Sequence, residues 1–273
     1  MTTAYFYKNT NSRFLAISGR DALAFIQNLV TNDVNLCTEN KYVYSCLLTP
    51  QGKFFADFFI FKNSEYYYME VHKKFYEDLI YKLEMYKLRS EVNIIPNKNL
   101  YSYVYFGDLA INNVLIKSYD PRNLKLGKKI ISKTKINTNI KQIYENEYHE
   151  IHIKNNIPYS PFDLDQNKSL LLENNFDNIN AISWEKGCYV GQEITARMKY
   201  RALLKKRIYP LVLIKGLPKN KQSICENEIE LGKIISMENN SILAMLKIEL
   251  AESKIKSQKK IKTNDGLVLD FIN

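Results

Sequence analysis

Hydrophobic and polar positions in the first hundred residues change between two periods, which predicts strands and helices in turn. The predicted elements are strands at 13–18, 42–49, 53–61, 65–71 and 91–95, and amphipathic helices at 18–34 and 73–88. Ser18 is placed to cap the first helix, with Asp21 three residues later. Pro-Gln-Gly at 50–52 suits a tight turn between two of the strands. This order of elements predicts a compact α+β unit.

The rest of the chain changes character once. Strands are predicted at 101–106 and 113–119, and a helix at 138–156, where apolar residues recur on one face. A loop with two prolines follows this helix. From 207 onward, three strand-like runs separated by polar turns predict an all-β part.

Composition indicates an ordered protein of 273 residues with a large core. No run of 18 apolar residues occurs, and the first residues resemble neither a secretory signal nor an Arg-rich presequence. We therefore expect a cytoplasmic protein and leave a processed mitochondrial matrix form open. The four cysteines, Cys37, Cys46, Cys188 and Cys225, have no metal-ligand spacing, so no stable metal site is expected.

The net charge of +10 is compatible with an anionic partner, such as nucleic acid or a ligand with several carboxylates. The charge is also explained by a general enrichment in lysine, which serves solubility. Arginine is scarcer, and Arg197, Arg201 and Arg207 lie close together in the sequence. Guanidinium groups form forked hydrogen bonds, so this cluster favours recognition of carboxylates or phosphates.

The stretch "KGCYVGQE" (186–193) contains the candidate functional thiol, Cys188, just before a helix predicted to begin near Gly191. A helix N-terminus and nearby cations favour the thiolate form, which is the nucleophile and metal ligand. A buried structural cysteine is the alternative. A Cys–His hydrolase would need one of only three histidines as its base, and no Asn or Asp is tied by spacing to His149 or His152.

Two carboxylates also stand out. Glu173 ends the apolar run "SLLLE" and is expected at the end of a strand, where it could accept hydrogen bonds from a heterocycle. Asp57 lies within a Phe-rich strand on the same face as Phe55 and Phe59. If it is buried there, it needs a partner.

Several stretches, in order, resemble the YgfZ family of folate-binding, aminomethyltransferase-like proteins. They are "FIQNLVTNDV" (25–34), "LLTPQGKFFADFFI" (47–60), "KLRSEVNI" (87–94), "DPRNLKLG" (120–127), "SLLLENNFDNINAISWEKGCYVGQEITARMKYR" (169–201) and "LGKIIS" (231–236). The resemblance covers roughly residues 12–250. Mitochondrial relatives in this family assist the assembly of [4Fe–4S] clusters.

The resemblance implies the α+β fold of the related T-protein, with three domains in a ring around a tetrahydrofolate channel. The domains would be residues 1–40 with 100–202, a ferredoxin-like insert at 41–99, and a β-barrel-like domain at 203–273. The implied site residues are Cys188 as functional thiol and possible transient cluster ligand, Glu173, Asp57, Tyr189 and Arg197 for the cofactor, and Lys186, Gly187, Gly191, Gln192, Glu193 and Arg201 of the motif.

Particular positions refine what the resemblance implies. Ala56 stands where the T-protein has its catalytic aspartate, and a methyl group cannot accept a proton, so an aminomethyltransferase is not expected. Glu173 matches the carboxylate that holds the pterin. Lys186 and Arg197 would favour the thiolate of Cys188, and Gly187 and Gly191 would let the backbone turn tightly around it.

The function expected from the resemblance is a tetrahydrofolate-binding accessory factor for assembly or repair of [4Fe–4S] clusters. Its partners would be a folate species, a cluster carrier and client enzymes such as tRNA methylthiotransferases, and the protein would be a monomer. Two alternatives stay open. One is a folate-dependent C1-transfer enzyme, and the other is a tRNA-binding module suggested by the net charge.

Overall fold

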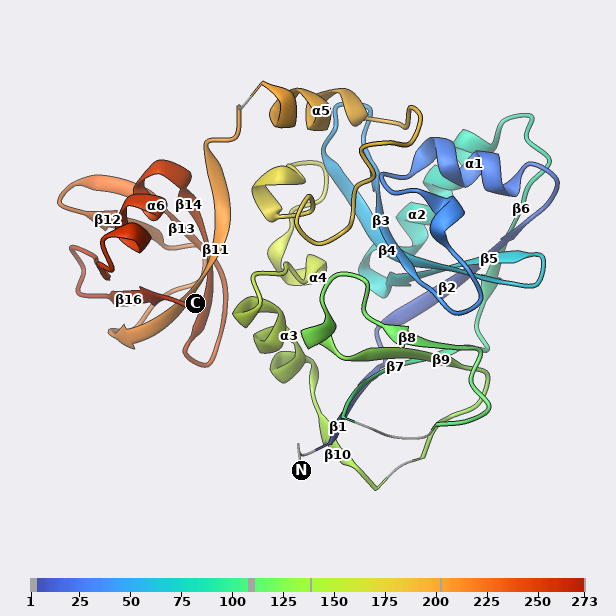
Figure 1. Ribbon diagram of the computed structural model, residues 1–273, viewed down its shortest axis with the longest axis horizontal. Helices are drawn as coiled ribbons and strands as arrows, with labels where there is room; N and C mark the ends of the chain where they lie inside the picture. The colour runs from blue at the N-terminus through green and yellow to red at the C-terminus, as the bar shows by residue number, and fades with distance from the viewer. Residues whose placement is uncertain (1–3, 108–110, 138, 202, 273) are drawn as a thin grey trace. The chain divides into compact units, whose positions relative to one another are not determined.

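The computed structural model describes residues 4–107, 111–137, 139–201 and 203–272, and the chain divides into two units. The first unit contains residues 1–145, 166–168 and 177–194, and the second contains residues 146–165, 169–176 and 195–273. Figure 1 labels their helices and strands. No helix among the described residues is both long and apolar enough to cross a membrane.

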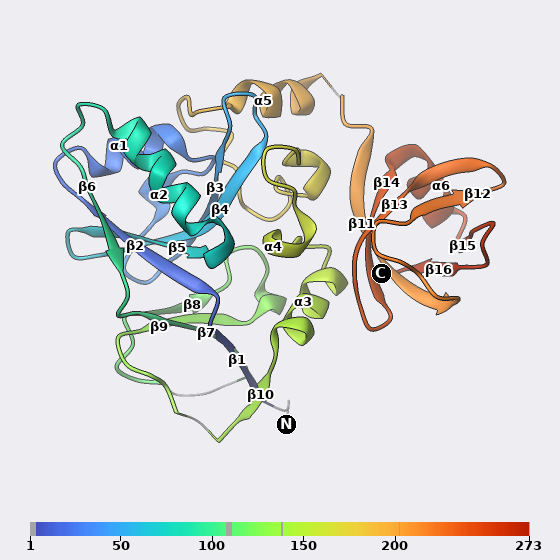
Figure 2. The ribbon, with the colours of Figure 1, turned by 180° about the vertical axis from the view of Figure 1, so that it is seen from behind.

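A five-stranded antiparallel sheet forms the larger part of the first unit. Its strands, in spatial order, are β3 (Val43–Leu48), β4 (Phe54–Asn63), β5 (Tyr66–His72), β2 (Ser12–Ser18) and β6 (Asn93–Asn97). Helix α2 (Lys73–Lys87) packs across β2, β4, β5 and β6, as Figure 2 shows. Its apolar face is buried as its periodicity predicts, with Phe75, Leu79 and Leu83 turned inward.

A second five-stranded sheet completes this unit, together with α1 (Ala22–Leu29), η1 (Val34–Leu36) and η2 (Leu124–Leu126). Its order is β10 (Lys141–Ile143), β1 (Tyr5–Asn9), β7 (Tyr101–Phe106), β9 (Lys128–Ser132) and β8 (Ile116–Tyr119). A buried ion pair joins the two sheets, because Lys129 Nζ lies 3.0 Å from Glu70 Oε2. Ser12 and Ser102 both donate hydrogen bonds to the other oxygen of Glu70.

The predicted helix at 138–156 is wrong in its first part. Residues 141–143 form β10, which pairs in parallel with β1, and helix α3 spans only Glu145–Lys154. Strand pairing with distant residues here overrides the local helical pattern. Position 138, where the helix was predicted to begin, lies outside the described residues.

A six-stranded antiparallel sheet, nearly closed and barrel-like, forms most of the second unit. Its order is β12 (Ser223–Glu226), β13 (Ile229–Glu238), β14 (Ser241–Lys247), β11 (Lys206–Lys215), β16 (Val268–Phe271) and β15 (Ile261–Lys262). The predicted all-β character is incomplete, since β14 ends at Lys247 and α6 (Ile248–Lys256) follows directly. Ala251 of α6 is buried in the core that fills this sheet.

The second unit also holds a buried histidine between two carboxylates. His149 of α3 places Nε2 3.0 Å from Asp163 Oδ1, at the end of α4 (Ser160–Asp163), and Nδ1 3.1 Å from Glu238 Oε1 on β13. Burial opposes the charge on His149, but the two carboxylates outweigh it and raise the pKa of the imidazole above its usual value. The cluster therefore connects two helices and a strand.

Candidate functional site

The predicted thiol lies on a loop of the first unit, residues 183–191, which we call the thiol loop. Both ends of the loop are anchored to the segment at the end of α1. Ser183 N donates to Thr31 O at 3.0 Å, and Val190 N donates to Asn28 O at 3.2 Å. Between these anchors Cys188 is exposed and has no disulfide partner. The alternative of a buried structural cysteine is therefore wrong.

Lys186 fixes the middle of the thiol loop. Its Nζ donates to the backbone oxygens of Gln27, Val30 and Asn32 at 2.6, 2.7 and 3.0 Å. These are carbonyl groups at the C-terminal end of α1, where a cation is favourable. Burial lowers the pKa of Lys186 to about 8, and the Asp33 carboxylate opposes this shift. The contacts give Lys186 a capping role at α1.

Gly191 and Gly52 explain why the thiol loop and the Pro-Gln-Gly turn both end in glycine. Gly191 has φ +78°, and a Cβ there would lie 2.3 Å from Thr49 O. Gly52 has φ +67°, and a Cβ there would lie 2.8 Å from Gly191 O. The two backbones therefore touch directly, which only residues without side chains allow. Gly187 has neither feature, since its φ is not left-handed and nothing lies within 4 Å of its missing Cβ.

Tyr189 and Gln192 support the loop on the other side of the thiol. The Tyr189 ring is buried, and burial raises the pKa of its hydroxyl. Lys186 Nζ lies 5.3 Å from the centroid of this ring. Gln192, the first residue of α5 (Gln192–Tyr200), accepts a hydrogen bond from Tyr189 N at 3.2 Å. Cys188 is thus exposed between two firmly held neighbours.

Of the remaining residues, Glu193 and Arg197 lie on α5, and Arg201 directly follows the end of that helix. Glu193 is exposed in the first turn of the helix. Arg197 and Arg201 are also exposed but belong to the second unit. The structure thus brings Lys186 and Tyr189 next to the thiol. Arg197 and Arg201 belong to the second unit, whereas the thiol loop belongs to the first.

Glu173 lies on a short 3-10 helix of the second unit, η3 (Leu172–Asn174), and not at the end of a strand as predicted. The turn is well held, because Asn174 Nδ2 donates to Leu170 O and Asn175 follows in a left-handed conformation. Arg207 Nη1 donates to Asn175 Oδ1 at 3.1 Å. Leu171 and Leu172 are buried, and η3 packs against β11.

Asp57 is buried on β4, with 9% of its surface exposed. Tyr44 donates a hydrogen bond of 2.7 Å to Asp57 Oδ2, while Oδ1 has no hydrogen-bond partner among the described residues. A buried carboxylate oxygen without a donor can accept a hydrogen bond from a bound ligand. Ala56 is fully buried and points to the opposite face of the sheet.

Sequence reasoning missed two residues beside Asp57. Tyr44 lies on β3 opposite Phe59, two pairs along from Cys46 and Asp57. The guanidinium of Arg122 stacks 4.9 Å from the Tyr44 ring and is held by a bidentate ion pair with Asp120. The sequence could have indicated both residues. Arg122 lies in "DPRNLKLG", which resembles the family, and Tyr44 lies in the predicted strand at 42–49. Among the described residues, no group of three or more His, Cys, Asp or Glu side chains could hold a metal ion.

Comparison with known proteins shows what the chain is similar to. Residues 7–99 match the GCVT N-terminal domain. The chain is 31% identical over 216 residues to "Iron-sulfur cluster assembly factor IBA57 homolog, mitochondrial" of Mycosarcoma maydis, covering 71% of this chain and 54% of that protein. It is 24% identical over 288 residues to "Iron-sulfur cluster assembly factor IBA57, mitochondrial" of Homo sapiens, covering 92% of this chain and 79% of that protein.

The chain therefore spans about half the length of the fungal relative. A solved structure with a similar fold is the glycine cleavage system aminomethyltransferase T from Bartonella henselae. The TM-score is 0.76 at 11% identity, and the match covers 99% of this chain and 85% of that one. This likeness confirms the predicted T-protein-like fold.

Proposed function

Because the chain belongs to the YgfZ-like family of T-protein-related proteins, we propose that it is a folate-binding accessory factor for assembly or repair of [4Fe–4S] clusters. One observation carries the proposal. Cys188 is an exposed free thiol on a loop whose backbone is fixed on both sides. A thiol presented in this way can meet a partner without reorganising the loop.

The cluster is the cargo in this proposal. A [4Fe–4S] cluster is usually held by four thiolates, and Cys188 would supply one of them to a cluster carried by a partner. Soft thiolate ligands suit iron–sulfur clusters. The names of the relatives support the same role, since they describe iron-sulfur cluster assembly factors.

The folate part of the proposal rests on two carboxylates. Tetrahydrofolate supplies ring nitrogens that carry one-carbon units, and its pterin presents several N–H donors. Asp57 fits such a ligand because its Oδ1 is buried without a donor. Glu173 is half-buried on a firmly held turn, and we propose that its carboxylate accepts hydrogen bonds from the pterin. Ala56 supplies no proton acceptor, so aminomethyl transfer is not part of the proposal.

The thiol is tested by replacing Cys188 with serine in cells that depend on this protein. Cys225→Ser is the matched control, because Cys225 is also free but lies on β12 of the other unit. We expect Cys188→Ser to lose most of the activity of a [4Fe–4S] enzyme while Cys225→Ser keeps it. Full enzyme activity with Cys188→Ser, at an unchanged protein level, would contradict the role of the thiol.

Folate binding is tested by calorimetry with tetrahydrofolate and 5-formyltetrahydrofolate. We expect one-to-one binding, weakened about tenfold or more by Glu173→Gln and by Asp57→Asn, since each change removes a charged acceptor. Glu185→Gln is the control, because Glu185 is an exposed carboxylate in the thiol loop. No saturable binding by the unaltered protein would remove folate from the proposal.

The proposal also names client enzymes. We propose that the clients include tRNA methylthiotransferases, which is tested by measuring tRNA methylthiolation in the Cys188→Ser strain. The relatives are mitochondrial by name, so we also propose either the mitochondrial matrix or the bacterial cytoplasm as the place of action. The three-domain division implied by the family stays a prediction, tested by limited proteolysis near residues 40, 100 and 202.

A further inference from the structure

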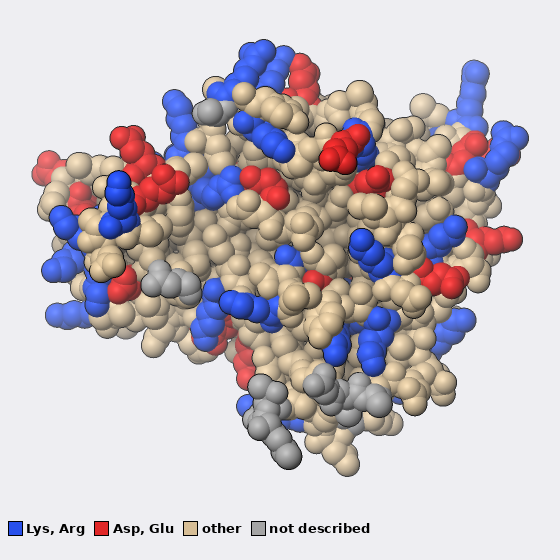
Figure 3. Space-filling view, viewed as in Figure 1, with Lys and Arg blue, Asp and Glu red and all other residues tan. Residues whose placement is uncertain are grey.

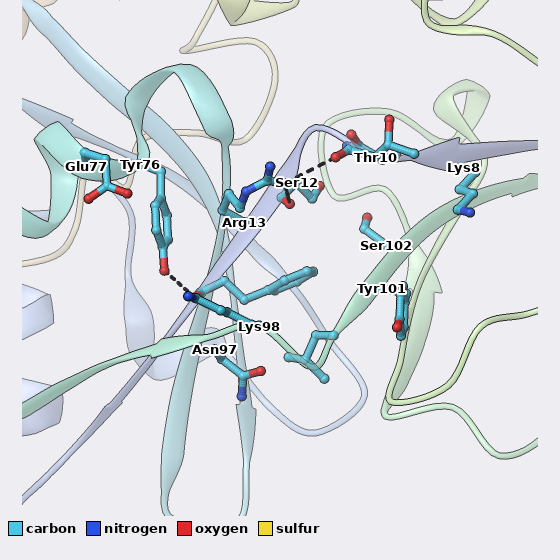
Figure 4. A pocket seen from close by; sticks show the side chains of 13 residues that line it. Lys8, Thr10, Ser12, Arg13, Tyr76, Glu77, Asn97, Lys98, Tyr101 and Ser102 are labelled. Atoms are coloured by element: carbon cyan, nitrogen blue, oxygen red, sulfur yellow. Dashed lines mark hydrogen bonds between the residues drawn. The ribbon is translucent and has the colours of Figure 1, made fainter.

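A cleft of about 500 Å³ lies within the first unit and shares no residue with the site described above. It is formed by the end of β1, the start of β2 and the turn between them, by α2, and by the segment that joins β6 to β7 (Figure 4). A volume of this size is in the range of small-molecule sites.

The cleft has an excess of positive charge. Lys8, Arg13 and Lys98 line it, and Glu77 is the single carboxylate among the lining residues. The cations come from three different segments, and Figure 4 shows Arg13 between Lys98 and the more distant Lys8. Neither lysine ammonium has a hydrogen-bond or ion-pair partner within the described part of the chain. The excess of two positive charges matches a phosphate dianion better than a single carboxylate.

Arg13 is oriented by the backbone before any ligand arrives. Its Nη1 donates to Thr10 O at 3.2 Å and to Ser12 O at 2.8 Å. These bonds leave Nε and Nη2 available, since neither has a partner among the described residues. Two N–H groups on one side of a fixed guanidinium form the fork that phosphate oxygens accept.

Aromatic rings supply a second kind of contact. Tyr76 and Tyr101 stand on opposite sides of the space in Figure 4, and both rings are half-buried. The Tyr76 hydroxyl donates to Phe14 O at 3.3 Å, which holds that ring in place. Ser102 is 2% exposed, and its hydroxyl is fixed by Glu70. The walls are thus preorganised for a flat apolar group.

We propose that this cleft binds a small molecule in which a phosphate dianion is joined to a planar ring, as in a nucleoside monophosphate. The phosphate lies in the fork of Arg13 between Lys8 and Lys98, and the ring packs against the tyrosines. The site is separate from the thiol and from both proposed folate carboxylates, so its occupancy is measured independently of them.

The test is calorimetry of the full chain with adenosine 5′-monophosphate as the probe. We expect saturable binding that adenosine and ribose 5-phosphate each show at least about tenfold more weakly, because one lacks the phosphate and the other lacks the ring. Arg13→Gln should weaken binding at least about tenfold, and Lys98→Gln about three- to tenfold. Arg13→Lys should restore only part of the loss, since an ammonium lacks the fork.

The matched control is Lys41→Gln, which removes an exposed lysine outside the cleft and should leave binding unchanged. Arg13 and Lys98 are exposed, so their variants should fold, as thermal unfolding followed by Trp184 fluorescence would show. Absence of saturable binding of adenosine monophosphate overturns the proposal. So does binding that Arg13→Gln and Lys98→Gln leave unchanged, or binding of a 5′-phosphorylated oligonucleotide without binding of the mononucleotide.

Discussion

At the scale of single residues, the motif around Cys188 separates into positions that shape the backbone and positions that are exposed, Cys188 among them. Gly191 is required by the close approach of the turn at Gly52, and Lys186 by the carbonyl groups at the end of α1. Gly187 and Cys188 meet neither demand. The sequence pattern treats all of these residues alike, and only the structure distinguishes their roles.

Gly191→Ala and Gly187→Ala form a matched pair. A Cβ at Gly191 would lie 2.3 Å from Thr49 O on a left-handed backbone, so we expect a loss of more than about 2 kcal/mol in the free energy of unfolding. Gly187→Ala should change it by less than about 0.5 kcal/mol. The single tryptophan, Trp184, lies in the thiol loop and reports urea unfolding by fluorescence. Equal effects of the two substitutions would contradict this account of the motif.

Lys186→Met should destabilise the thiol loop. The change leaves three carbonyl groups at the end of α1 without their charged donor, so we expect a loss of about 2 kcal/mol in the free energy of unfolding. Lys41→Met, at an exposed lysine, is the control. Urea unfolding followed by Trp184 fluorescence measures both, and indistinguishable midpoints would show that the cap contributes nothing.

At the scale of elements, periodicity predicted most strands and the two N-terminal helices but not where helices meet strands in the second half. The boundary between β10 and α3 depends on pairing with β1, more than a hundred residues earlier, which no local pattern contains. Helix α6 was predicted as part of a strand for a similar reason, since its apolar residues serve the core of the barrel-like sheet. Glu173 was predicted at the end of a strand because the apolar run before it is equally compatible with a strand and with a buried 3-10 turn.

The cluster that connects α3, α4 and β13 should make stability depend on pH. The folded-state pKa of His149 is raised, so its contribution is complete below the unfolded value of about 6.5 and is lost as pH rises through the folded value. His149→Gln should therefore cost roughly 3 kcal/mol at about pH 6 and less at about pH 9. Urea unfolding followed by circular dichroism at both pH values measures this difference.

His72→Asn is the control for that experiment. Burial lowers the pKa of His72, so its contribution to stability rises as pH increases through about 6.5. Asparagine keeps an acceptor for the N-cap bond from Lys74 N. If the cost of His149→Gln were the same at both pH values, the imidazole would not be charged in the folded protein.

At the scale of the whole molecule, the family resemblance predicted the fold and the functional thiol. The residues that contact the site were identified only in the structure. Tyr44 donates a hydrogen bond to Asp57 from the neighbouring strand, and Arg122, which is distant in sequence, lies over the Tyr44 ring. The net charge of +10 identifies no partner by itself. On the face shown in Figure 3, lysine and arginine side chains are scattered among acidic ones and do not form one basic surface.

The mixture of charges on this face favours only weak and nonspecific binding of RNA there. Fluorescence anisotropy with labelled tRNA should show affinity at about 50 mM salt that is largely lost at about 200 mM. This is expected when the protein contacts only the phosphates of the RNA. Arg13→Gln and Arg197→Gln should have small and similar effects. Tight binding that persists at the higher salt concentration would support the tRNA-binding alternative.

The contact between Gly191 and Gly52 also has a consequence for biosynthesis. The turn at Gly52 and the end of α1 leave the ribosome long before the thiol loop does, so their partners are absent while the middle of the chain is made. Closing such a distant contact is slow compared with forming local helices. A chain that stops early, or that has not finished folding, therefore does not present Cys188 in its fixed position. The thiol is held in one position for a partner only on a protein whose first unit is complete.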